Sequence, residues 1–324
     1  MLREQDVGHR IVVRRIVGSR AGRPVFSDAL GELVELTETH LEMTTRQGRL
    51  RVPIAEVHRA KRVPPSRRPT AEAMIELELA ADEAWPAPVR DRLGDWLLRS
   101  ADGWTGRANS ALPVGDPDRP LPAALDAVHR WYAERGRPAI VNTPLPLATP
   151  VDAELDLRGW ESRPLVLVQT VPLADLTAPG GRRDHTVAAA APTVELTTAP
   201  SDDWLAVAAG RKGGLPDAAR HVLTAVDQVR FAHAYDGDTL LGVGRGTVTG
   251  GGRWLGLSLI EVLPEARRRG VARAVIGALA QWAGTAGAVD VFLQVEQRNA
   301  PAVALYRTLG FSTHHTYRSR VAPS

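Results

Sequence analysis

The 324-residue sequence predicts a mixed α/β protein that carries a small β-barrel at its N-terminus. Three observations support this fold class. Short segments of alternating apolar residues fill residues 1–63, and helical and extended patterns alternate through residues 70–178. A longer run of strands and helices fills residues 186–324. Because 324 residues exceed the size of one ordinary core, we expect these three segments to be separate domains.

The N-terminal segment has the period of short β-strands. Apolar residues alternate at 11–17, 33–36, 41–44 and 50–54, and Gly22-Arg23-Pro24 and Gln47-Gly48 supply turns between them. About five strands of this length predict a small barrel that resembles an SH3-like or Tudor-like module. The proline-rich segment Val63 to Pro69 predicts a linker at its end.

The charge is distributed unevenly along the chain. Residues 1–69 hold thirteen Arg and one Lys against eight acids, a balance of 14 − 8 = +6, so the remainder carries 3 − 6 = −3. A basic N-terminal module is typical of proteins that contact nucleic acid or an acidic partner. An Arg-rich face that is merely solvated explains the same count.

Residues 70–178 predict an α/β half-domain. Residues 121–135 have the spacing of an amphipathic helix that ends at Gly136, and a strand begins at Pro138. A short helix over 153–157 leads into a strand at 165–168. Gly180 to Asp184 then predicts a second connector.

Residues 186–324 predict a complete α/β unit. Its expected strands are 194–197, 229–235, 240–249, 254–262, 289–295 and one that begins at Phe311, and its expected helices are 204–209, 217–226, 271–286 and 300–309.

A basic loop joins the strand that ends near Pro264 to the helix that begins at Val271. It consists of Arg267-Arg268-Arg269-Gly270. The first amides of a helix have no intrahelical partner and lie at the positive end of the helix dipole, so a helix start of this kind suits a pyrophosphate. As a solvated turn, the same arginines would oppose the dipole at a cost of a few tenths of a kcal/mol per charge.

Two motifs at fixed distance resemble the GCN5-related N-acetyltransferase (GNAT) family. The first is Val-x-Pro-x-x-Arg-x-x-Gly-x-Ala, from Val262 to Ala272, and the second is Asn299 followed by Tyr306 and Leu309-Gly310-Phe311. The resemblance implies the GNAT fold, with a mixed, mostly antiparallel sheet, for residues 186–324. Residues 132–160 resemble a degenerate copy of the last helix-strand unit of that fold, without the basic loop. The middle segment is therefore expected to be a degenerate GNAT-like half without a cofactor.

The resemblance also implies roles for individual residues. Tyr306 would be the catalytic residue that protonates the leaving thiolate. The backbone near Val262 would polarise the thioester carbonyl. The implied acetyl-CoA-binding residues are Ile260, Glu261, Val262, Arg267, Arg268, Arg269, Gly270, Val271, Ala272, Arg273 and Asn299.

The general base is left open by the sequence. Relatives that acetylate protein N-termini often carry a glutamate five residues before the asparagine, where this chain has Gln294. Glu296, Glu261 or a chain of water molecules could take the proton instead. The expected reaction is direct acetyl transfer from acetyl-CoA to an amine, since the chain has no cysteine to form a covalent intermediate. The alternative is a non-catalytic acetyl-CoA sensor whose basic N-terminal barrel contacts nucleic acid or a protein partner.

Several features of the sequence limit the partners. It has no cysteine, and its adjacent His314 and His315 would lie on opposite faces of a strand, so we expect no metal. No apolar stretch is long enough for a membrane span, and no signal peptide begins the chain, which predicts a cytoplasmic protein. We expect acetyl-CoA and an amine acceptor, either a small molecule or a peptide, as ligands of a monomer or homodimer. Nucleic acid is not an expected substrate.

A possible acceptor site lies in the middle segment. Residues 96–99 and 103–110 alternate large apolar and polar residues, and we expect a strand pair there that lines the acceptor cleft with Arg107. The alternative is that Trp96 and Trp104 simply fill the core of this segment.

Overall fold

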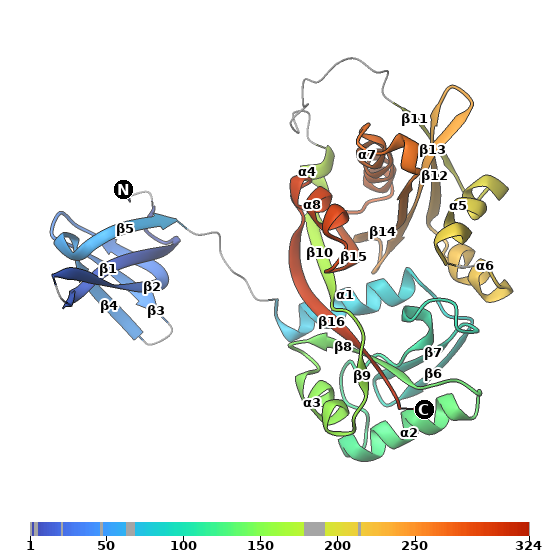
Figure 1. Cartoon of the computed structure of the whole chain (residues 1–324), viewed down its shortest axis with the longest axis horizontal. Helices are drawn as coiled ribbons and strands as arrows, with labels where there is room; N and C mark the ends of the chain where they lie inside the picture. The colour runs from blue at the N-terminus through green and yellow to red at the C-terminus, as the bar shows by residue number, and fades with distance from the viewer. Residues whose placement is uncertain are drawn as a thin grey trace. The chain divides into compact units, whose positions relative to one another are not determined.

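The computed structural model describes residues 2, 6–20, 22–45, 48–62, 69–177, 192–212 and 215–323. The chain divides into two compact units, residues 1–68 and 69–324 (Figure 1). Most of the linker expected between Val63 and Pro69 and all of the connector expected at Gly180–Asp184 lie outside the described residues. No helix of the described residues is both long and apolar enough to cross a membrane.

The first unit is one antiparallel sheet. Its strands are β1 (Arg10–Arg20), β2 (Arg23–Leu36), β3 (His40–Thr45), β4 (Gly48–Pro53) and β5 (Val57–Arg62), with a short 3-10 helix, η2 (Ile54–Glu56), before β5. The buried apolar residues are Ile11, Val13, Leu33, Leu41, Met43 and Val52. The strand order is β4-β3-β2-β1-β5, and β4 and β5 do not pair with each other in the described sheet. The described sheet is therefore open, and the predicted SH3-like barrel is not confirmed.

The second unit begins with the elements of residues 69–177. These are α1 (Ala71–Glu83), β6 (Val89–Leu93), β7 (Trp96–Ser100), η3 (Arg107–Asn109), α2 (Leu121–Ala133), β8 (Ile140–Leu145), α3 (Thr149–Leu157), β9 (Glu161–Ser162), β10 (Val166–Pro172) and α4 (Leu173–Thr177). The helix α1 has no counterpart in the prediction. The predicted pairing of residues 96–99 with residues 103–110 is wrong. The strand β7 pairs with β6 instead, and residues 103–110 form a turn and η3.

The rest of the unit follows the predicted order of strands and helices. Its elements are β11 (Thr193–Thr197), α5 (Asp202–Lys212), α6 (Asp217–Thr224), β12 (Val229–Asp236), β13 (Thr239–Thr249), β14 (Trp254–Val262), η4 (Pro264–Ala266), α7 (Val271–Thr285), β15 (Asp290–Glu296), α8 (Ala300–Thr308) and β16 (Ser312–Val321).

One mixed sheet of nine strands holds this unit together. The order is β11-β12-β13-β14-β15-β10-β16-β8, with β9 beside β16. Only β14 and β15 run parallel, and the other neighbours are antiparallel. The strand β10 lies between β15 and β16, so strands of both expected segments alternate in one sheet. The division into 70–178 and 186–324 as separate domains stays a prediction.

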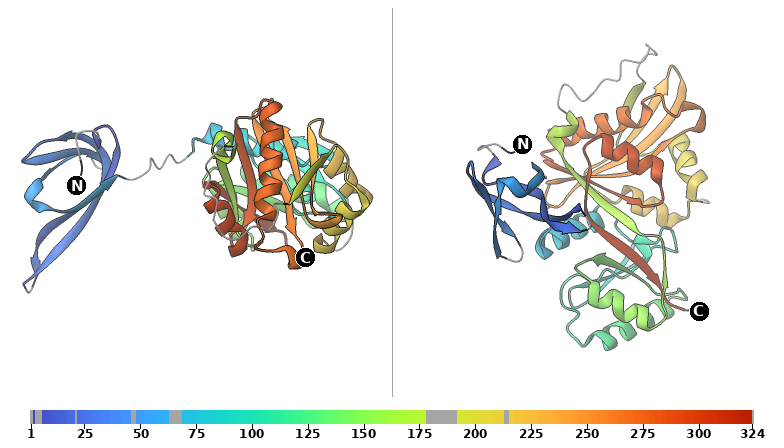
Figure 2. Two further views of the ribbon diagram at one scale, coloured as in Figure 1. Left: turned by 90° about the horizontal axis from the view of Figure 1, so that it is seen from above. Right: turned by 60° about the vertical axis from the view of Figure 1, so that its left-hand side comes forward.

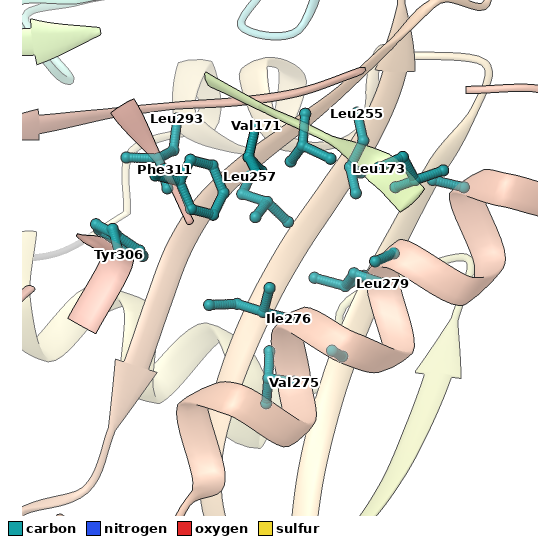
Figure 3. Close-up of a cluster of buried hydrophobic side chains, with 14 of the residues drawn as sticks. Val171, Leu173, Leu255, Leu257, Val275, Ile276, Leu279, Leu293, Tyr306 and Phe311 are labelled. Carbon is teal, nitrogen blue, oxygen red and sulfur yellow. The ribbon is translucent and has the colours of Figure 1, made fainter. Parts of the chain in front are cut away.

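The helix α7 covers one face of this sheet, as Figure 2 shows in orange. Val275, Ile276 and Leu279 of α7 pack against Leu255 and Leu257 of β14 (Figure 3). A Cβ atom on Gly244 of β13 would lie 2.5 Å from Val275 Cγ1, so the glycine lets the helix approach the strand. The opposite face is covered by α1, whose Leu77 and Ala81 pack with Trp254 and Phe292. Burial of both faces fixes the position of the strands between them.

Candidate active site

The strands β14 and β15 pair at one end only. Trp254 to Leu257 run in register with Asp290 to Leu293, after which no pairing joins the two strands in the described sheet. β14 continues to Val262 and β15 to Glu296. Backbone groups that face this divergence are left without a strand partner, so an extended ligand can pair with them. The predicted cofactor residues 260–262 lie on the diverging part of β14.

A β-bulge marks the point of divergence. Val243 opposes Glu261 and Arg245 opposes Ser258, so two residues of β14 face Gly244 alone. One of them, Leu259, has a φ of 52°, a conformation that branched side chains rarely adopt. Strained bulges take backbone amides out of the ladder and are frequent at active sites.

The loop that is predicted to bind an anion lies directly before α7. Gly270 caps the helix with a φ of 81°, and Arg268 is also left-handed with a φ of 63°. The Arg267 amide bonds to the Pro264 carbonyl at 3.3 Å and the Ala274 amide bonds to the Gly270 carbonyl at 3.1 Å. The described backbone offers no acceptor to the amides of residues 268–273. Free amides at the positive end of a helix dipole are suited to bind an anion, so this loop is a candidate anion site.

The arginine side chains of the loop have different surroundings. Arg269 pairs with Asp236 at 2.7 Å, and Arg273 donates to Thr308 Oγ1 of α8 at 2.7 Å. Arg267 and Arg268 are exposed and have no acidic partner among the described side chains. These two guanidinium groups are therefore available to an anion that docks on the loop.

Tyr306 and Asn299 lie on α8. The Tyr306 side chain is 9% exposed and packs edge-on against Phe311, with ring centroids 5.7 Å apart (Figure 3). It belongs to the same apolar cluster as Leu293 and Val295, which places it on the α7 side of β15. Asn299 Oδ1 accepts a hydrogen bond from the Ala302 amide at 3.4 Å and caps α8.

The other face of the diverging strands is polar. The neighbours of Gln294 on β15 pack toward α7, so Gln294 itself points toward the face covered by α1. Arg245 opposes Ser258 across β13 and β14, and Val168 opposes both Gln294 and His315. The Oε1 atom of Gln294 is buried and has no hydrogen-bond partner among the described residues. An unpaired acceptor of this kind is costly unless a ligand satisfies it.

Arg245 is a fully buried cation. Its guanidinium donates to the carbonyls of Ala84 at 2.9 Å, Leu223 at 2.9 Å and Val222 at 3.3 Å. No carboxylate contacts it within the described part of the chain. Burial, followed by the charge of Arg107, lowers the pKa of Arg245 to about 9, so the group is still charged at neutral pH. It therefore contributes positive potential to this face.

A carboxylate and two histidines lie at the far end of the polar face. His315 Nε2 lies 2.7 Å from Glu78 Oε1, and His315 Nδ1 lies 2.8 Å from His314 Nδ1. The expectation that the two histidines occupy opposite faces is wrong, because a bulge in β16 brings the rings together. Burial and His315 lower the pKa of His314 to about 4, so its ring is neutral at pH 7.

The two candidate bases, Glu296 and Glu261, lie on the diverging parts of β15 and β14. Glu296 is exposed and bonds to Arg298 at 2.6 Å, and Glu261 is half-buried on β14. Their positions do not favour one of these two glutamates over the other as the general base. No group of three or more His, Asp or Glu side chains is placed to hold a metal ion in the described ranges.

Trp96 and Trp104, which the sequence places in either the acceptor cleft or the core, lie in different apolar clusters. Trp96 belongs to the apolar core between β7 and α2, as the alternative interpretation expects. Trp104 stacks on Trp85 at 5.4 Å in a cluster that includes Phe231 of β12. The Arg107 guanidinium lies 5.6 Å from the centre of the Trp85 ring.

Sequence reasoning missed Trp85, Arg245 and Tyr317. A single arginine within an otherwise small and apolar strand was the available signal for Arg245. Trp85 and Tyr317 gave no local signal, because their neighbours come from distant parts of the chain.

A cavity of about 350 Å³ lies elsewhere, against Trp96, Leu147 and Val151. Arg119 is the charged side chain among the residues that line it. No carboxylate, histidine or hydroxyl side chain lines it, so it does not offer the chemistry of a catalytic site.

The architecture defines a class of proteins. A GCN5-related N-acetyltransferase from Kribbella flavida has the same fold, with a TM-score of 0.60 at 15% identity over 80% of this chain and 97% of that chain. The second unit is thus a GNAT fold.

Sequence relatives narrow the class. Residues 70–320 match the family model described as probable histone acetyltransferase Rv0428c C-terminal. A probable histone acetyltransferase of Mycobacterium tuberculosis is 31% identical over 330 aligned residues, 98% of this chain and 96% of that protein. An uncharacterized N-acetyltransferase of Bacillus subtilis is 29% identical over 254 residues, 75% of this chain and 97% of that protein. The chain belongs to the Rv0428c C-terminal family of acetyltransferases.

Proposed function

We propose that this acetyltransferase moves the acetyl group of acetyl-CoA directly to an amine that enters between β14 and β15. The observation that carries the proposal is the divergence of these strands beside the free amides of residues 268–273. An extended ligand with a pyrophosphate at one end fits both features. Neither feature alone would indicate such a ligand. The proposal rests on their occurrence side by side.

The residues divide the binding of acetyl-CoA between them. The amides of residues 268–273 hold the pyrophosphate, with Arg267 and Arg268 adding charge. The backbone of residues 260–262 pairs with the pantetheine arm. Asn299 directs the start of α8 toward the thioester end. When bound, acetyl-CoA supplies a thioester carbonyl that a neutral amine can attack.

The two faces of the sheet separate the two halves of the reaction. An amide at the Leu259 bulge donates to the carbonyl oxygen as negative charge develops there. On the α7 side, the Tyr306 hydroxyl gives its proton to the departing sulfur and regains one from solvent. On the α1 side, Gln294 Oε1 accepts a hydrogen bond from the amine, whose surplus proton passes to solvent. Attack and departure thus occur on opposite faces, through the gap between the strands.

A negative charge introduced into the candidate anion site tests cofactor binding. Ala272→Glu places a carboxylate against the bound pyrophosphate, while a glutamate in the first turn of α7 favours folding. We expect at least a 10-fold weaker affinity for acetyl-CoA by calorimetry, which corresponds to about 1.4 kcal/mol. Gln281→Glu is the matched control, since it adds the same charge about 13 Å further along the same helix. Equal affinities in both variants would reject the site.

Removal of a single hydroxyl separates an enzyme from a sensor. Tyr306→Phe keeps the packing against Phe311 and removes the proton donor. We expect acetyl-CoA to bind with unchanged affinity, while release of the CoA thiol slows roughly 100-fold. An unchanged rate would remove Tyr306 from the mechanism. Binding without any turnover in the parent protein would favour the sensor, an alternative supported by the neutral Gln294.

The names of the relatives suggest candidate acceptors. The M. tuberculosis relative is named a probable histone acetyltransferase, which makes protein lysine one candidate acceptor. Small amines and peptide N-termini are the others. The fold does not determine the substrate. The choice among these acceptors therefore depends on the residues of the polar face.

A further inference from the structure

The loop of residues 101–109 holds Arg107 in a fixed position. Asn109 is buried, and its Oδ1 accepts hydrogen bonds from the amides of Ala101 at 2.8 Å and Gly103 at 2.9 Å. Its Nδ2 donates to the carbonyls of Trp104 at 3.0 Å and Thr105 at 2.8 Å. The side chain of Asn109 therefore organises the whole turn that presents Arg107.

The contacts of Arg107 place its guanidinium over the diverging strands. The guanidinium lies 5.6 Å from the Trp85 ring, which Arg245 of β13 approaches to 5.3 Å. It also lies close enough to Tyr317 of β16 to offset part of the rise in pKa that burial causes in that hydroxyl. The strands β14, β15 and β10 lie between β13 and β16. Arg107 must therefore lie above these central strands, on the face where Gln294 has its unpaired oxygen.

Two positive charges on this face, Arg107 and Arg245, make no ion pair among the described residues. Arg107 is half-buried and, like Arg245, has no carboxylate partner among the described residues. Glu78 contacts His315 at 2.7 Å and contacts neither guanidinium. Two unpaired guanidiniums disfavour the ammonium form of an amine and repel polycations. A carboxylate would gain a planar, charge-assisted partner in Arg107.

We propose that Arg107 selects acceptors whose amine is accompanied by a carboxylate, with the amine nitrogen held on Gln294 Oε1. The class comprises amino acids and peptides in which a carboxylate lies beside the reacting amine. This inference rests on the proposed acetyl transfer, and it names the substrate class of that site. It separates these acceptors from polyamines, aminoglycosides and lysines of basic tails.

A comparison of acids with their amides tests the selection. The acceptors are glycine, β-alanine and γ-aminobutyrate, each beside its amide, together with spermidine and a basic lysine peptide. We expect one or more acids to exceed their amides in kcat/KM by about 10- to 100-fold in the parent protein. In Arg107→Gln that ratio falls to within about twofold, and Arg107→Lys keeps an intermediate ratio. Arg130→Gln, on the exposed side of α2, is the control and keeps the parent ratio.

Binding measurements distinguish failure of this inference from failure of the proposed function. Calorimetry on the full chain, with and without saturating CoA, compares the same acids and amides even if no turnover occurs. Acetyl-CoA binding with an acid-to-amide ratio that Arg107→Gln leaves unchanged overturns the inference alone. Preference for spermidine or the basic peptide overturns it as well. Absence of both acetyl-CoA binding and acid binding overturns the two proposals together.

Discussion

In the proposed reaction, Gln294 faces the amine without the ability to take its proton. A neutral amide can only accept a hydrogen bond at neutral pH, so the acceptor must arrive deprotonated. The guanidiniums of Arg107 and Arg245 on the same face help, because positive charge lowers the pKa of an ammonium group nearby. The site thus depends on electrostatics where a carboxylate would depend on proton transfer.

A carboxylate at this position should change the dependence of rate on pH. We expect Gln294→Glu to move the rising limb of kcat/KM to lower pH and to raise the rate at pH 7 roughly 10-fold, because a glutamate can accept the amine proton. Profiles between pH 6 and 9 measure the effect, with Gln281→Glu as the control for added charge. Superimposable profiles for the parent and Gln294→Glu would mean that residue 294 does not face the amine.

Single residues were predicted unequally well from the sequence. Gly270 and Asn299 are local signals, since a helix start and a cap are defined by their immediate neighbours. Arg107 and Arg245 both lie near Trp85, and this proximity is created by folding. The candidate cofactor site could therefore be predicted, whereas the polar face opposite it could not.

At the scale of elements, the close packing of α7 on β13 determines where the candidate anion site lies. Gly244→Val would drive a side chain into Val275 and Ile260, and we expect a loss of about 1–3 kcal/mol in the free energy of unfolding. Gly277→Ala, at a position of α7 with open space around it, should instead add about 0.5–1 kcal/mol. Urea unfolding of both variants measures the difference, and equal stabilities would contradict this packing.

The helix α3 is tied to β16 by a charged cluster. Asp152 accepts from Arg320 at 2.8 Å, from Arg318 at 3.1 Å and from Thr143 at 3.1 Å. Burial alone would raise the pKa of Asp152, but these hydrogen bonds and charges outweigh it and hold the pKa below its ordinary value. An acid whose pKa is lower in the folded state contributes stability above its unfolded pKa, and that stability is lost as the pH falls through the folded pKa.

Asp152→Asn should therefore destabilise the protein in a pH-dependent way. We expect a loss of about 3 kcal/mol at pH 7, and a difference from the parent that shrinks as the pH falls below about 4. Asp126→Asn is the control, because its exposed pair with Arg158 at 2.7 Å is worth less than about 1 kcal/mol. Denaturant unfolding at pH 7 and at pH 3 measures both. A pH-independent loss would show that the charge of Asp152 is not what holds the cluster.

The helix α1 shows why one element escaped prediction. Its Glu78 and Asp82 are buried, the first against His315 and the second against Arg99 at 3.1 Å. These partners are far away in sequence, so the helix lacks the clean apolar stripe that identifies an amphipathic helix. Elements with local patterns, such as α7 and β13, were predicted within a residue or two of their observed ends.

At the scale of the molecule, the order of strands decides what can fold alone. Residues 192–323 supply β15 and β16, but β10, from the preceding segment, lies between them. It pairs with β15 over Val166 to Pro172 and with β16 over Val166 to Thr170. Pairing between strands that are distant in the sequence depends on the tertiary fold and not on the local residue pattern. The sequence therefore predicts two halves where the structure has one sheet.

This interleaving predicts how fragments behave. Residues 192–324 alone would expose the facing edges of β15 and β16, so we expect them to aggregate. Co-expressed fragments 69–177 and 192–324 should assemble into a one-to-one complex that binds acetyl-CoA, because every strand of the sheet is then present. Residues 69–324 should fold without 1–68, which form a separate compact unit. Gel filtration and calorimetry of the three preparations measure this. A soluble, monomeric 192–324 that binds acetyl-CoA as well as the full chain would show that β10 is not needed to complete the sheet.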